Sequence, residues 1–102
     1  MTNLQQALKQ KTFHWKPKHL NHIAENIVFK KRNVSFLAIN ALFRQERFEI
    51  EIDPNFDNSY IIVGFLPLLP NDRLRTRAEV LKVVFDIDKH FNIIPITAYS
   101  EK

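Results

Sequence analysis

The spacing of the apolar residues changes once along this chain, near residue 47, and that change constrains the fold more than any other feature. Before it, apolar residues recur at intervals of three and four, which is typical of amphipathic helices. After it, apolar and charged residues alternate, which is typical of strands with one face in water. Helical segments followed by strands predict an α+β fold rather than alternating α/β units.

Three helices are predicted in the first half: a short one within residues 1–11, a longer one from Pro17 to Arg32, and a third from Phe36 to Phe43. Proline suits the first position of a helix, because the N–H that it lacks would be unpaired there in any case. Ser35 is a suitable N-cap for the third helix. Asn33 is expected just past the end of the second helix, since Asn tolerates the left-handed conformation.

Four strands are predicted in the second half: Phe48 to Asp53, Ser59 to Leu66, Val80 to Asp88 and Ile93 to Ser100. Their short connections, including a turn at Pro54 to Asn58, predict one antiparallel meander with the Pro17 to Arg32 helix packed on one face. The exception is a long loop from Pro67 to Ala78. In the first strand we expect Phe48, Ile50 and Ile52 to face the core, and Glu49 and Glu51 to face solvent.

The length of 102 residues allows one hydrophobic core and is too short for two, so residues 1–102 are expected to form a single domain. Cysteine is absent, which excludes disulfides and thiolate metal sites and suits a reducing compartment such as the cytoplasm. No apolar run approaches the roughly 18 residues that cross a bilayer. We therefore expect a cytoplasmic protein with no membrane span and no signal peptide.

Positive charge is the first indication of a partner, because a net charge of +4 and a pI of about 9.6 favour phosphate-rich surfaces. Seven cations lie between Lys9 and Arg32, against one anion, Glu25. In the predicted loop, arginines alternate at positions 73, 75 and 77. If that loop is extended they point the same way and could clamp a phosphate. The alternative for both groups is an ordinary solvated surface.

The predicted RNA-binding residues are the basic side chains of the loop and of the helix end, with one aromatic residue: Arg73, Arg75, Arg77, Lys82, Lys31, Arg32 and Trp15. Trp15 could stack a base, although packing at the edge of the core is the alternative. With a single glycine in the chain, a backbone cradle for a nucleotide cofactor is not expected, and we predict no cofactor.

Several segments resemble a known family. FHWKPKH (Phe13 to His19) and NVSFLAINALF (Asn33 to Phe43) resemble the opening and the second helix of the BrnT-like toxins of bacterial toxin–antitoxin systems. YIIVGF (Tyr60 to Phe65), LKVVF (Leu81 to Phe85) and ITAY (Ile96 to Tyr99) are similar to the later strands of that family. The resemblance implies a RelE-like ribonuclease scaffold that cuts RNA by metal-independent acid/base chemistry and is silenced by a cognate antitoxin.

The chain also departs from the family pattern. The first helix of the family ends in a basic residue, His and Gly, where this chain has Lys31, Arg32 and Asn33. The family's last strand continues Ser-Ala-Arg-Arg, and the corresponding residues, 97–100, include no arginine. Because a scaffold depends on the apolar pattern and cutting depends on particular side chains, these departures bear on activity. The alternative function is a non-enzymatic binding or inhibitor protein on the same scaffold.

RNA cleavage needs a base for the ribose 2′-hydroxyl, an acid for the leaving oxygen and cations over the phosphate. The catalytic candidates are Tyr99 with Thr97, expected on the same face of the last strand, and His19 with His22, three residues apart on a helix. A nuclease should also place a loop arginine or Lys82 near Tyr99. Structural roles at a sheet end and on a helix surface are the alternatives. No third ligand joins the histidines, so no metal site is predicted.

Overall fold

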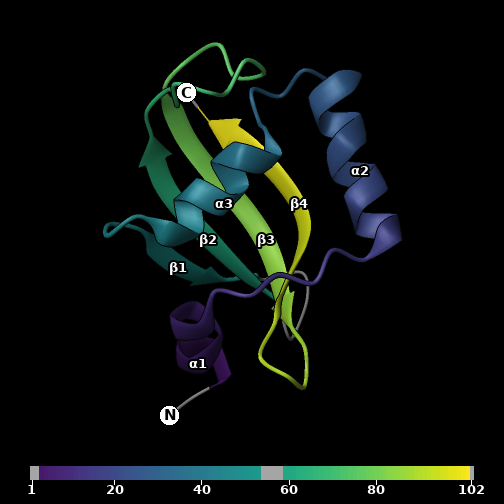
Figure 1. Ribbon diagram of the computed structural model, residues 1–102, viewed down its shortest axis with the longest axis vertical. Coiled ribbons are helices and arrows are strands. Elements are labelled where there is room, and N and C mark those ends of the chain that lie inside the picture. The colour runs from purple at the N-terminus through teal and green to yellow at the C-terminus, as the bar shows by residue number, and fades with distance from the viewer. Residues whose placement is uncertain (1–2, 54–58, 102) are drawn as a thin grey trace.

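The computed structural model describes residues 3–53 and 59–101, in which three helices precede a four-stranded antiparallel sheet (Figure 1). The helices are α1 (Asn3–Gln10), α2 (Pro17–Val28) and α3 (Phe36–Arg44). The strands are β1 (Glu49–Ile52), β2 (Tyr60–Leu66), β3 (Glu79–Ile87) and β4 (Ile93–Glu101), and they lie side by side in sequence order. The predicted α+β fold and antiparallel meander are confirmed. The turn predicted at Pro54 to Asn58 lies outside the described residues.

The helices gather on one face of the sheet. Figure 1 shows α3 crossing in front of β2 and β3, while α2 runs beside β4, against which it packs. The core lies between the helices and this face, and it contains Ala7 of α1, Ile23 of α2, Phe43 of α3, Phe85 of β3 and Ala98 of β4. No described helix covers the opposite face, which we call the open face of the sheet.

The starts of α2 and α3 are as predicted. Pro17 is the first residue of α2, and the Ser35 hydroxyl accepts a hydrogen bond from the Ala38 N–H at 3.0 Å, which caps α3. The end of α2 was predicted at Arg32 and is wrong, because the helix ends at Val28. The chain then turns through Asn33, whose φ of 56° confirms the expected left-handed conformation although it does not adjoin the helix end.

The single glycine, Gly64, lies in β2 beneath α3. A Cβ atom at this position would lie 2.5 Å from Nε2 of Gln45 and 2.9 Å from Cδ1 of Leu42. A larger side chain would therefore require the side chains of Gln45 and Leu42 to move, so glycine here leaves room for these two residues of the α3 region against β2.

The predicted orientation of the first strand is mostly confirmed. Phe48 and Ile50 pack against the core, and Glu49 and Glu51 are exposed. The expected burial of Ile52 is wrong, because its side chain is 74% exposed. Ile52 is the last residue of an edge strand, and an edge strand has a neighbour on one side only.

Candidate nucleic-acid interface

A basic cleft of about 540 Å³ opens between the end of α2 and the 67–78 loop. Three cations line it: Lys31, Arg73 and Arg77. The rest of its lining is uncharged: Ile27, Val28, Asn33, Val34, Leu74 and Thr76. The fold thus brings together residues that are more than 40 positions apart in sequence, three of which were predicted to bind RNA.

Arg75 holds the loop that forms one wall of this cleft. Its side chain is buried, with 3% exposure, and its guanidinium donates to the carbonyl oxygens of Leu66 (2.9 Å), Pro67 (2.8 Å) and Asn33 (3.3 Å). Burial lowers the pKa of Arg75, against the opposing effect of nearby carboxylates. The expectation that all three loop arginines point the same way is therefore wrong, since the Arg75 side chain turns inward to backbone acceptors.

Asn33 provides a second attachment for the same loop. Its Nδ2 donates to the Arg77 carbonyl at 3.0 Å, and its Oδ1 accepts from the N–H groups of Thr76 (2.7 Å) and Arg77 (3.2 Å). These bonds join the α2–α3 connection to the loop on the other side of the cleft. The two walls are therefore fixed to each other by a buried side chain rather than by chain connectivity.

The cations of the cleft differ in how far they are neutralised. Arg77 Nε donates to Glu79, and hydrogen bonds from Arg77 and from Ser100 (2.7 Å) lower the pKa of the Glu79 carboxyl. Lys31 and Arg73 are exposed and have no hydrogen bond or ion pair from their side chains to any residue within 3–53 and 59–101. Arg32 lies beside the cleft, and its carbonyl accepts from Ser100 Oγ at 3.1 Å. Two uncompensated cations therefore face one hollow.

Two of the catalytic candidates meet at the edge of β4. His22 Nε2 lies 3.1 Å from Thr97 Oγ1, and Asn26 Nδ2 donates to the same hydroxyl at 3.2 Å. His19 lies one turn earlier on α2, where burial, followed by Lys18 and Lys16, lowers its pKa. These groups surround a threonine hydroxyl and do not line the basic cleft.

The register agrees with the expectation that Tyr99 and Thr97 share a face of β4, because they pair with Lys82 and Val84, two residues apart on β3. The shift in register between Val84 and Phe85 falls before Thr97 in β4, and the Thr97 hydroxyl meets His22 of α2. Ala98 is buried in the core, and its neighbour Tyr99 therefore points to the open face. Within residues 3–53 and 59–101, no hydrogen bond joins Tyr99 to the other three catalytic candidates.

Lys82 is the cation whose position in the sheet is next to Tyr99. The two residues are directly opposite each other on β3 and β4. Lys82 Nζ also lies 3.2 Å from Glu101 Oε1, and this hydrogen bond raises the pKa of the lysine. One of the cations that a nuclease was expected to need near Tyr99 is thus present, but it is shared with a carboxylate.

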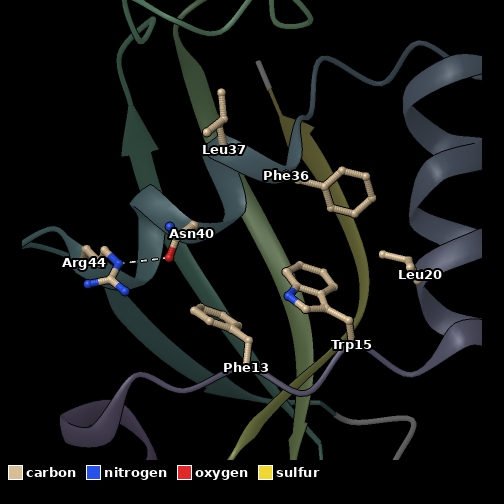
Figure 2. A pocket seen from close by; sticks show the side chains of 7 residues that line it. All are labelled: Phe13, Trp15, Leu20, Phe36, Leu37, Asn40 and Arg44. Carbon is tan, nitrogen blue, oxygen red and sulfur yellow. Dashed lines mark hydrogen bonds between the residues drawn. The ribbon is translucent and has the colours of Figure 1, made fainter.

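A second hollow, which we call the aromatic groove, lies against α3 and has a volume of about 540 Å³ (Figure 2). Its lining residues come from the α1–α2 connection, α2 and α3: Phe13, Trp15, Leu20, Phe36, Leu37, Asn40 and Arg44. Sequence reasoning selected only Trp15. Asn40 and Arg44 were missed because two polar residues four positions apart on a helix are typical of a solvated face.

Comparison with known proteins finds no match: no family model, no curated protein and no solved structure is significantly similar to this chain. Among residues 3–53 and 59–101, no three His, Cys, Asp or Glu side chains group closely enough to hold a metal ion. None of the helices in the same ranges has the length and apolar content to cross a membrane.

Proposed function

We propose that this protein binds single-stranded RNA and that the basic cleft takes a phosphate of the RNA backbone. The observation that carries this proposal is the position of Lys31 and Arg73, which line one cleft without a partner carboxylate among the described residues. Like charges held at one hollow repel each other, and a bound anion relieves that repulsion. A cytoplasmic location, where RNA is available, is part of the proposal.

The fixed geometry of the cleft supports this function. The hydrogen bonds of Arg75 and Asn33 hold the loop in place before any ligand arrives, so less conformational entropy is lost on binding. Guanidinium groups suit phosphate because their planar N–H donors match its oxygens. The resemblance to ribonuclease toxins favours RNA as the source of the phosphate.

Cleavage of the bound RNA is a second candidate function. The observation in its favour is that Lys82 lies opposite Tyr99, which is the arrangement expected of a nuclease that uses this tyrosine. Binding alone is the preferred proposal, because Tyr99 points to the open face while the basic cleft lies on the helical side. A cognate antitoxin, which the BrnT-like resemblance implies, stays a prediction.

The test of the binding proposal is a salt titration with a single-stranded RNA oligonucleotide. The double variant Lys31→Ala/Arg73→Ala should bind more weakly, and the slope of log affinity against log salt should become shallower by about 0.7 for each phosphate that the variant no longer neutralises. Neither side chain has a partner among residues 3–53 and 59–101, so the fold should be retained.

The matched control is Lys9→Ala/Lys89→Ala, which removes the same net charge at exposed positions outside the cleft. Its affinity should stay closer to that of the wild-type protein. Equal losses in both variants would mean that total charge, and not the cleft, determines binding. A wild-type protein that binds no RNA would refute the proposal.

A further inference from the structure

The aromatic groove has the form of a site for a flat, unsaturated ring. Trp15 stacks near Phe13, with centroids 5.8 Å apart and planes 18° apart, and meets Phe36 edge to face at 5.4 Å and 84°. Figure 2 shows the indole between Phe13 and Phe36, with Leu20 of α2 facing it across the hollow. An indole ring is a suitable platform for such a ligand, because aromatic side chains stack on nucleic-acid bases through the π-face that every base has.

The polar groups of the groove are hydrogen-bond donors. Arg44 Nε donates to Asn40 Oδ1 at 2.9 Å, which occupies the oxygen of the amide (Figure 2). The Asn40 amide nitrogen and the two η nitrogens of Arg44 have no acceptor within the described parts of the chain. None of the described residues that line the groove is acidic. A ligand that fits must therefore offer acceptors at one edge of its ring.

The groove and the basic cleft share α2 as a wall. Leu20 lines the groove, and Ile27 and Val28 line the cleft, seven and eight residues further along the helix. At about 1.5 Å of rise per residue, this separation is roughly 11 Å. Stacked nucleotides are spaced at about 3.4 Å along a strand, so the distance corresponds to roughly three nucleotides. One short segment of RNA can reach both.

We propose that the aromatic groove binds an unpaired guanine of the same RNA strand whose phosphate occupies the basic cleft; this inference rests on the proposed RNA binding. The guanine stacks on Trp15 and accepts hydrogen bonds at O6 and N7 from the η nitrogens of Arg44. Guanine is favoured over adenine because the adenine edge places an amino donor where guanine has the O6 acceptor. Exposed Lys16 and Lys18, next to the groove, complement the flanking phosphates.

The experiment uses a short oligouridine that carries one central guanine, with matched oligonucleotides in which that base is adenine or is absent. An abasic site keeps every phosphate and removes only the ring. In the wild-type protein, loss of the base should weaken binding on the order of tenfold, with no change in the salt slope. Adenine should also bind more weakly than guanine.

Two variants locate the effect. Trp15→Leu should abolish the difference between the guanine and abasic oligonucleotides, and Trp15→Phe, which keeps a stacking ring, should restore part of it. Arg44→Gln is the second variant, because this exposed side chain can be changed without opening the core; it should remove the preference for guanine over adenine while some stacking remains.

The outcomes separate this inference from the proposed function. RNA binding with a normal salt slope and no dependence on the central base would overturn the guanine site and leave the phosphate cleft standing. An abasic penalty that persists in Trp15→Leu would also overturn it. Unchanged RNA affinity in Arg44→Gln for all three oligonucleotides would assign the groove to another ligand, such as a hydrophobic protein segment. Failure of the wild type to bind any RNA would overturn both proposals.

Discussion

A charged side chain holds each of the connections at the two ends of β3 in place. The two charges have opposite sign, and the two connections differ in how many of their other charged groups are paired. Before β3, the 67–78 loop buries the Arg75 guanidinium against backbone carbonyls and leaves Arg73 without a partner in the described residues. After β3, the Asp88 carboxylate accepts from the N–H groups of His90 (2.8 Å) and Asn92 (2.9 Å). Among the described residues, the first end leaves the Arg73 cation without a partner, whereas the polar side chains of Asp88 and Asn92 at the second end are hydrogen-bonded to each other and to the segment before α2.

The difference shows which charges are structural and which are available. A structural charge has its hydrogen-bonding capacity filled by the fold, as for Arg75 and for Asp88, whose pKa is lowered to about 2, chiefly by the Asn92 N–H. An available charge has none of that capacity filled by the described part of the chain, as for Arg73 and Lys31. Burial and partners distinguish the two classes, and residue type does not.

The largest expected effect is at the loop end of β3. Replacing Arg75 with Met keeps much of the side-chain volume and removes every donor, so three carbonyl oxygens lose their partner. We expect a loss of about 3 kcal/mol or more in the free energy of unfolding, measured by urea titration. Arg73→Met should change it by less than about 0.5 kcal/mol. Similar values for the two variants would show that the inward and outward arginines do not differ.

A smaller effect is expected at the other end of β3. Asp88 has a folded pKa of about 2, below the ordinary value of about 3.9, so its contribution to stability is complete at neutral pH. That contribution should be lost as the pH falls from about 4 through about 2. Because Asn does not titrate, Asp88→Asn should lose less stability over this window than the wild type. The free energy of unfolding is measured by urea titration at each pH. Equal losses of this free energy in the two proteins would exclude Asp88 as the charge that holds the turn.

The smallest effect is expected from Tyr99→Phe, which keeps the ring and removes only the hydroxyl. If the protein binds RNA without cutting it, affinity, salt slope and the integrity of the RNA should all match the wild type. Expression of both chains in bacteria extends the test to toxicity. Growth arrest by the wild type that is lost in the variant would favour the nuclease, in which Lys82 lies opposite Tyr99.

Much of the fold could be predicted because its signals are local. Ser35 caps α3 by a bond to a residue three positions away, and the alternation in β1 follows from the pleat of a single strand. The two errors of the fold concern context rather than pattern. The end of α2 depends on how the chain returns toward Asn33, and the exposure of Ile52 depends on what covers the corner of the sheet.

The candidate site was harder to predict, because its parts depend on contacts between distant segments. Three alternating arginines are identical in sequence, yet Arg75 is bound by carbonyls that include one 42 residues away. Thr97 and Tyr99 share a face of β4 as the alternation predicts, yet the meeting of the Thr97 hydroxyl with His22 joins residues 75 positions apart. The aromatic groove is lined by Arg44 of α3 and by Trp15 of the α1–α2 connection, and no spacing pattern in the sequence indicates that these two residues lie near each other.

The bridge between Phe13 and Ile93 has a consequence for the order of folding. The segment before α2 is held by the start of β4, through the His14 N–H to the Ile93 carbonyl at 2.8 Å and the Gln10 side chain to the His90 carbonyl at 3.1 Å, across 80 residues of chain. We expect contacts of such long range to form later than the local hairpins, because the entropy of closing a long loop is lost before the contacts can stabilise it. A nascent chain can pair its early hairpins, but the bridge between Phe13 and Ile93 can form only after β4 has left the ribosome.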